Sequence, residues 1–103
     1  MPKPEIDADG YLVDPSDWSE EWARDVARNL QIELTDEHWD VLRFMRGYHE
    51  EHQVPPDVRF VIRHLAETRG AARNRIFELF PSGYAGPACK IAGMRRPRIW
   101  STG

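Results

Sequence analysis

Hydrophobic residues recur at helical spacing through most of this chain, with polar residues between them. In residues 14–30 an apolar side chain returns every four positions, at Trp18, Trp22, Val26 and Leu30. This spacing predicts a first helix with one buried face. Asp14 followed by Pro15 is typical of a helix N-terminus, because the carboxylate can cap and proline fits the first helical position.

The pattern predicts two further long helices. A second helix starts at Thr35, where Leu34 and Trp39 have the spacing of a hydrophobic staple. A third helix lies in residues 54–70, entered through a turn at Pro55 and Pro56. Its apolar side chains recur at i, i+3, i+4 and i+7: Val58, Val61, Ile62 and Leu65. Gly70 can adopt the left-handed conformation that ends a helix.

The last elements are short. A fourth helix in residues 71–80 follows Gly70 with almost no loop and stops at Pro81, and a fifth covers about Pro87 to Ala92. Residues 5–13 predict a β-hairpin, since Asp9-Gly10 suits a type I′ turn. We therefore expect a single mainly α domain over residues 1–103. It consists of an N-terminal hairpin, a small orthogonal bundle of about five helices in residues 14–93, and an extended C-terminal arm in residues 94–103.

Composition indicates a small globular protein of the cytoplasm. Hydrophobic residues make up 41% and charged residues 30% of the 103 positions, ordinary values for a folded soluble chain. No apolar run approaches the roughly 20 residues needed to cross a bilayer, and the first residues contain no apolar signal region. The single cysteine excludes a disulfide within the chain and fits a reducing compartment.

That cysteine, Cys89, is the strongest candidate for chemistry. If Gly86 caps the last helix and Pro87 is its first residue, the thiol lies in the first turn, where the helix dipole favours a thiolate. From residue 86 onward the chain carries four basic and no acidic residues, against a net charge of −7 before it. We expect Lys90, Arg95 and Arg96 to lower the thiol pKa. The alternative is a small buried residue that fills a helix interface.

Other patterns in the sequence are weaker evidence for a functional site. His49 and His52 lie one helical turn apart, but no Cys/His cluster completes a tetrahedral site, so we expect no metal and no cofactor. Residues 59–75 are rich in arginine, and two helices around a glycine turn are similar to a helix-turn-helix, which makes three side chains candidates for DNA contact: Arg69, Arg73 and Arg75. The pI of about 5.8 is unlike that of most DNA-binding modules.

Three segments together resemble a known family: "DADGYLVDPSDWSEEWA", "IELTDEHWDVLRFMRGYHEEHQVPPDVR" and "LFPSGYAGPACKIAGM". They are similar to the DsrC/TusE proteins, small sulfur carriers of the sulfite reductase and tRNA-thiolation systems. The resemblance implies a compact helical fold with a mobile C-terminal arm and sulfur-relay or sulfite reductase proteins as partners. It also implies that a cysteine near the arm's tip forms a persulfide and that a second, helix cysteine supports it. Cys89 matches the helix cysteine.

The chain departs from this family at the arm. Eleven residues after Cys89, where the family places its tip cysteine, stands Trp100. Three hypotheses follow. The chain is a one-cysteine persulfide carrier through Cys89, a docking or regulatory paralogue that anchors its arm through Arg98 and Trp100, or a DNA-binding regulator.

Overall fold

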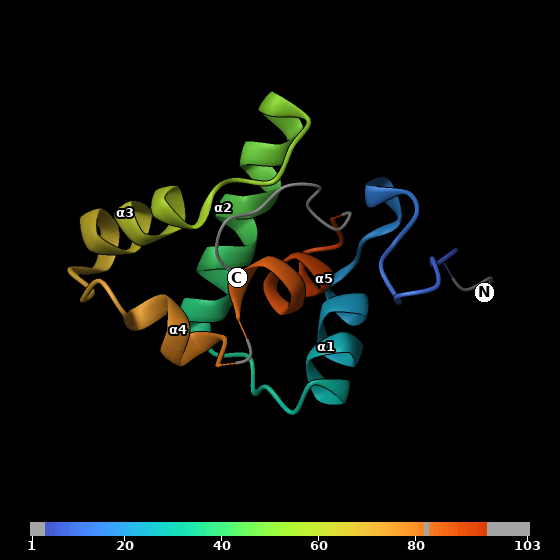
Figure 1. The fold of residues 1–103 in the computed structure, drawn as a ribbon, viewed down its shortest axis with the longest axis horizontal. Coiled ribbons are helices and arrows are strands. Elements are labelled where there is room, and N and C mark those ends of the chain that lie inside the picture. Colours follow the sequence, from blue (N-terminus) through green and yellow to red (C-terminus); the bar gives the residue numbers. More distant parts are fainter. Residues whose placement is uncertain (1–3, 82, 95–103) are drawn as a thin grey trace.

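The computed structural model describes residues 4–81 and 83–94 (Figure 1), and these are mainly helical, as predicted. In chain order the elements are a 3-10 turn Pro15–Asp17, α1 Glu20–Asn29, α2 Asp36–His52, α3 Val58–Arg69, α4 Arg75–Leu79, a π-helical turn Tyr84–Ala88 and α5 Cys89–Ile91. Figure 1 shows α5 in the middle of the view, with α1 below it and α3 and α4 to its left. No helix among these residues is long and apolar enough to span a membrane.

The predicted N-terminal hairpin does not form regular strands in the described residues. A single antiparallel bridge joins Ile6 to Leu12. The carboxylate of Asp7 accepts hydrogen bonds from the backbone N–H groups of Asp9 and Tyr11, both at 2.9 Å. A type I′ turn needs positive φ at both central residues, but of Asp9 and Gly10 only Gly10 has positive φ, at 87°. The Asp7 side chain therefore organises this turn in place of the predicted type I′ geometry.

The first helix is divided where the sequence predicts one continuous element. Asp14 caps only the 3-10 turn, by accepting from the N–H of Ser16 at 3.0 Å. Trp18 is extended, with φ −63° and ψ 144°, and α1 then begins with Ser19 as its own cap, the Ser19 hydroxyl accepting from the N–H of Trp22 at 3.1 Å. Two competing caps lie five residues apart, so each starts its own helix.

The second helix begins and the third helix ends as predicted, whereas the last two helices differ. Thr35 precedes α2, and Gly70 ends α3 in the left-handed region with φ 63°. The fourth helix is five residues long and starts only at Arg75, so residues 70–74 form a connection. Helical structure at the end of the chain starts at Tyr84 rather than Pro87, because a π-helical turn runs without interruption into α5.

One hydrophobic core joins all five helices. Its members are buried side chains from each of them and from the π-helical turn, including Val26, Val41, Leu42, Met45, Val61, Leu65, Ile76, Leu79, Phe80, Tyr84, Cys89 and Ile91. Burying such side chains contributes roughly 1.5–3 kcal/mol each. The short helices α4 and α5 are therefore held by tertiary packing, because three- and five-residue helices have no stability of their own.

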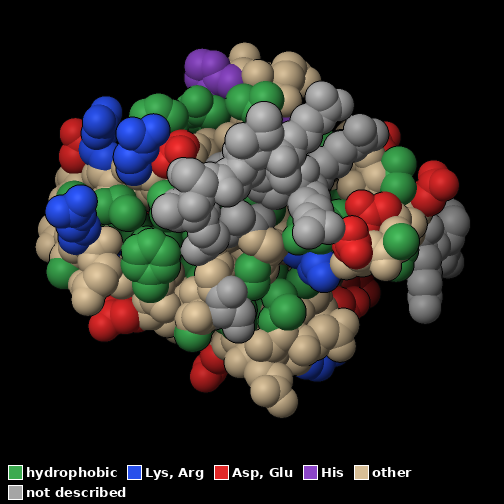
Figure 2. Space-filling model, viewed as in Figure 1, with side chains coloured by type: hydrophobic (Ala, Val, Ile, Leu, Met, Phe, Trp, Pro, Cys, Tyr) green, Lys and Arg blue, Asp and Glu red, His purple; other side chains and the backbone are tan. Residues whose placement is uncertain are grey.

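Aromatic rings continue the α2–α3 contact toward the surface. Phe44 stacks on the imidazole of His64, with ring centroids 4.4 Å apart, and Tyr48 lies 5.7 Å from Phe60. These four side chains line a shallow groove between the two helices. Figure 2 shows basic side chains gathered at the α3 side of this face, where α3 carries exposed Arg59, Arg63 and Arg69.

Candidate functional site at the end of the last helix

Cys89 lies inside a helical segment, not in its first turn. The preceding π-helical turn starts at Tyr84, whose buried hydroxyl donates to the carbonyl of Pro56 at 2.6 Å. Residues 84–88 therefore form the first turn of the helical segment, and Cys89 follows it. The predicted cap at Gly86 is wrong, since the residue before α5 is Ala88, itself in the right-handed helical region.

The thiol is buried and its pKa moves in the direction opposite to the expected one. Cys89 has no solvent-exposed surface and belongs to the core. Burial raises its pKa to about 12, because desolvation penalises the thiolate. In this conformation Cys89 is a small neutral core residue, the alternative left open by the sequence.

Lys90 extends away from the helix toward the N-terminal segment. Its ammonium lies 4.9 Å from the centre of the Tyr11 ring, a cation–π distance. Activation of the thiol by Lys90, Arg95 and Arg96 stays a prediction, because both arginines lie outside the described residues. The docking residues Arg98 and Trp100 lie outside them as well, so their roles also stay predictions.

The last turn of α5 is closed by its own backbone. Gly93, with φ 74°, donates to the carbonyl of Lys90 at 3.1 Å, and Met94 donates to the carbonyl of Cys89 at 2.9 Å. This pair of bonds is the Schellman motif, which ends a helix with a left-handed glycine. Met94, assigned to the arm by the sequence, is fully buried and completes this motif.

Three side chains hold the same turn from outside. The indole N–H of Trp22 donates to the carbonyl of Lys90 at 3.0 Å, and that of Trp18 donates to Ile91 at 2.9 Å. The Arg46 guanidinium donates to the carbonyl of Ala92 at 2.7 Å. We call Trp18, Trp22 and Arg46 the carbonyl clamp.

Arg46 connects three parts of the fold. Besides Ala92, its guanidinium donates to the carbonyl of Pro15 at 3.1 Å and lies 4.3 Å from the centre of the Trp18 ring. Partial burial lowers the pKa of Arg46 from its ordinary value, yet a guanidinium stays charged at any physiological pH. Its charge lies at the carbonyl end of α5, the favourable end of the helix dipole for a cation.

The sequence singled out none of the clamp for this role. It assigned Trp18 and Trp22 to a buried stripe, and it did not consider Arg46. The available signal for the clamp was the pair of tryptophans at i and i+4, together with a last helix that ends at Gly93. The sequence could not connect them, because the donors and acceptors are 46 to 73 residues apart in the chain.

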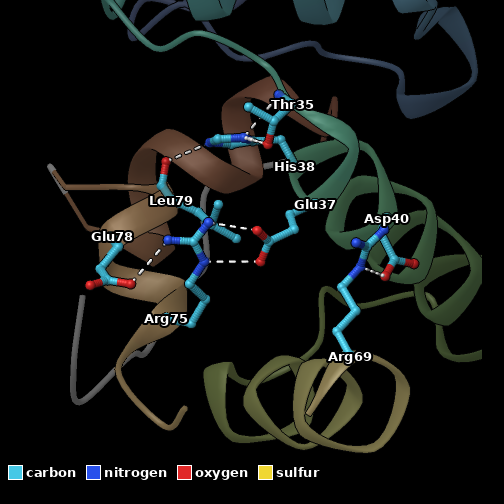
Figure 3. Close-up of polar contacts among 8 residues, drawn as sticks. All are labelled: Thr35, Glu37, His38, Asp40, Arg69, Arg75, Glu78 and Leu79. Atoms are coloured by element: carbon cyan, nitrogen blue, oxygen red, sulfur yellow. Dashed lines mark hydrogen bonds and ion pairs between the residues drawn. The ribbon is translucent and has the colours of Figure 1, made fainter. Parts of the chain in front are cut away.

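The candidate DNA-contact arginines are mostly engaged within the protein (Figure 3). Arg75 donates through Nε and Nη2 to the two carboxylate oxygens of Glu37, with Nε–Oε2 at 2.9 Å, and through Nη1 to Glu78 at 3.1 Å. Arg69 donates to Asp40 at 3.0 Å. Hydrogen bonding from Arg75 lowers the pKa of Glu37. Arg73 is exposed.

The helix pair around Gly70 also lacks the dimensions of a DNA reader. α4 has five residues, so it is about 7.5 Å long. A recognition helix presents several side chains along the major groove, and α4 is too short to do so. Within the described residues, the structure gives the DNA hypothesis no support.

The histidines act in packing. His38 is buried, with Nδ1 accepting from the N–H of Thr35 at 3.1 Å and Nε2 donating to the carbonyl of Leu79 at 2.7 Å (Figure 3). Burial lowers its pKa. His49 and His52 are not part of any metal-binding group: across residues 4–81 and 83–94, no three His, Cys, Asp or Glu side chains are placed to share an ion.

Comparison with known proteins places these features in a family. The sequence model described as "DsrC like protein" matches residues 2–99. The chain is 40% identical over 96 residues to the Sulfurtransferase TusE homolog of Haemophilus influenzae, covering 90% of this chain and 88% of that protein. It is 38% identical over 96 residues to Sulfurtransferase TusE of Escherichia coli, with 90% and 88% covered.

Solved structures agree with the sequence matches. The oxidized gamma-subunit of the dissimilatory sulfite reductase (DsrC) from Archaeoglobus fulgidus superposes with a TM-score of 0.87 at 36% identity, covering 96% of this chain and 93% of that one. A chain in the crystal structure of dissimilatory sulfite reductase I superposes with a TM-score of 0.79 at 32% identity, covering 93% and 89%.

Proposed function

Because this chain belongs to the DsrC-like family, we propose that it acts in a bacterial-type sulfur relay or with a sulfite reductase as a docking or regulatory protein that does not itself carry sulfur. The coarse assignment, a DsrC/TusE sulfur-relay protein, follows from the family. The finer role is inferred from the chemistry of this chain's own residues.

The observation that carries the proposal is the state of its only thiol. The 103 residues contain one cysteine, and Cys89 is fully buried with a pKa raised to about 12. Sulfur transfer to a cysteine requires a thiolate that the donor can reach. Cys89 meets neither condition in this fold.

The arm supports the same proposal. Trp100 occupies the position at which the family resemblance expects the sulfur-accepting cysteine. A large aromatic side chain and neighbouring arginines are the residue types that anchor protein interfaces. We infer that Trp100 and Arg98 bind a sulfur-relay or sulfite reductase partner in the cytoplasm.

Intact-protein mass spectrometry after exposure to a persulfide donor tests the proposal. Escherichia coli TusE, treated identically, is the positive control, and Cys89→Ser is the matched negative control. The proposal expects no gain of about 32 Da, the mass of one sulfur, on the wild-type chain. A gain on wild type that is absent from Cys89→Ser overturns it and assigns a one-cysteine carrier, which would need the core around Cys89 to open.

Docking is tested separately with the purified dissimilatory sulfite reductase of Archaeoglobus fulgidus as the probe, in a direct binding titration. Cys89→Ser should keep the wild-type affinity, whereas Trp100→Ala should lose it. Equal affinity of Trp100→Ala and wild type would contradict anchoring through the arm.

A further inference from the structure

The end of α5 is fixed by hydrogen bonds from the backbone and from side chains of other helices. Every carbonyl from Ala88 to Ala92 accepts a hydrogen bond within the fold. The backbone supplies the bonds to the first three of these carbonyls, through the Schellman motif and the N–H of Ala92. Side chains supply those to the last two, and Lys90 accepts from both sources. The last four carbonyls of a helix have no partner in the regular helical hydrogen-bond pattern and need partners from outside it.

The position of these bonds matters because they lie at the end of the described helical segment, directly before residues 95–103 in the sequence. Met94 is buried, and residues 95–103 continue from it. The clamp comes from two directions: Trp18 and Trp22 from the α1 side, and Arg46 from α2. Hydrogen bonds from these two sides restrain both the position and the orientation of the last turn of α5.

Close packing at Gly93 restrains the same turn in addition to the hydrogen bonds. A Cβ atom on Gly93 would lie 2.5 Å from Cδ1 and 2.9 Å from Cγ of Trp18, so the indole is packed directly on the backbone of residue 93. The Arg46 guanidinium lies against the same indole. The Trp18 ring therefore contacts both the Arg46 guanidinium and the backbone of Gly93.

We propose that Arg46, together with Trp18 and Trp22, is the positioning group of the C-terminal arm: by holding the carbonyls of Lys90, Ile91 and Ala92 it sets the direction in which residues 95–103 leave the fold. The effect on partners rests on the proposed docking function. A segment that starts in its binding direction loses less conformational entropy on association, so the clamp raises the arm's affinity without touching the partner.

The arm's direction is measured without any partner. Nitroxide labels at Glu21→Cys, exposed on α1, and at Ser101→Cys report an interspin distance distribution by pulsed electron paramagnetic resonance. Cys89 is buried and stays unlabelled, which mass spectrometry verifies. The proposal expects a broader or shifted distribution in Arg46→Met and in Trp22→Phe than in the otherwise wild-type chain.

Two controls separate positioning from general damage. Arg43→Met makes the same chemical change at an exposed position of the same helix and should leave the distribution unchanged. Arg46→Lys keeps a cationic donor and should give a width between wild type and Arg46→Met. Circular dichroism establishes that each variant is folded. If Arg46→Met does not fold, Trp22→Phe decides, since it keeps an aromatic side chain but removes the indole N–H that donates to Lys90.

Unchanged distance distributions in Arg46→Met and Trp22→Phe overturn the positioning role.

The link to docking is tested with the Archaeoglobus fulgidus sulfite reductase as the probe. Arg46→Met should weaken binding about tenfold, the scale of ordering one or two side chains. Broader distributions with undiminished affinity overturn the link to docking. A wild-type chain that does not bind overturns the proposed function instead, while the distance distributions still decide the positioning role.

Discussion

The Nε2 atom of His38 lies 2.7 Å from the carbonyl oxygen of Leu79, and this hydrogen bond ties the start of α2 to the end of α4 (Figure 3). Because Nδ1 of the same ring accepts from the N–H of Thr35, the two bonds require a neutral imidazole that is protonated on Nε2 only. The ring also packs edge-on against Phe80, with centroids 5.2 Å apart.

This geometry predicts that stability falls as the medium becomes mildly acidic. Burial lowers the pKa of folded His38 below its ordinary 6.5, so the unfolded state binds the proton more readily. The stability contributed by neutral His38 is complete above pH 6.5 and is lost as the pH falls through the folded pKa. Urea unfolding at pH 7.5 and 5.2 should show a smaller free energy of unfolding at the lower pH.

His38→Gln should flatten this pH dependence, and exposed His52→Gln on the same helix should preserve it. His49, whose pKa burial also lowers, contributes with the same sign, so His49→Gln is measured in parallel. A pH slope in His38→Gln as steep as that of wild type would contradict the prediction.

Two glycines with left-handed backbone give a matched pair for the packing at Trp18. Gly93→Ala combines positive φ with a clash against Trp18, and we expect it to cost about 2–4 kcal/mol of unfolding free energy. Gly70→Ala has similar φ but open space around it, so it should cost only about 1–2 kcal/mol. Chemical denaturation measures both, and equal losses would show that the Trp18 contact is unimportant.

The Glu37–Arg75 ion pair predicts different consequences for two neighbouring arginines. Arg75→Ala removes the two bonds to Glu37 and should lower the urea midpoint, with a smaller effect at high salt because the pair is partly exposed. Arg73→Ala, at an exposed position, should leave the midpoint unchanged. If both variants unfold at the wild-type midpoint, the bridge adds nothing to stability.

The burial of Cys89 predicts slow thiol chemistry. With Ellman's reagent at pH 8 the folded chain should react only at the rate at which the core opens, whereas the chain in guanidinium chloride should release one equivalent of chromophore at once. Raising the pH to 9 should leave the folded rate low, since the thiol pKa is about 12. Immediate reaction of the native protein would favour the one-cysteine carrier.

Much of this fold follows from local patterns in the chain. The caps and stop signals of α2 and α3 lie within a few residues of the helix ends they control, so Thr35 and Gly70 predicted those ends correctly. The family resemblance likewise rests on contiguous segments, and the comparisons confirmed it. Errors arose where two local signals compete, as at Asp14 and Ser19, or where a helix is too short to form without its neighbours, as in residues 71–80 and 84–91.

The chemistry of the site depended on contacts between distant parts of the chain. Neighbouring charges and a supposed first-turn position predicted an activated Cys89, but the thiol is buried in the core, where desolvation raises its pKa. Trp18, Arg46 and His38 each hydrogen-bond to a backbone carbonyl that lies 31 to 73 positions away in the chain. Composition and periodicity describe what lies along a helix, whereas a thiol's pKa and a guanidinium's hydrogen bonds depend on what the folded chain packs around them.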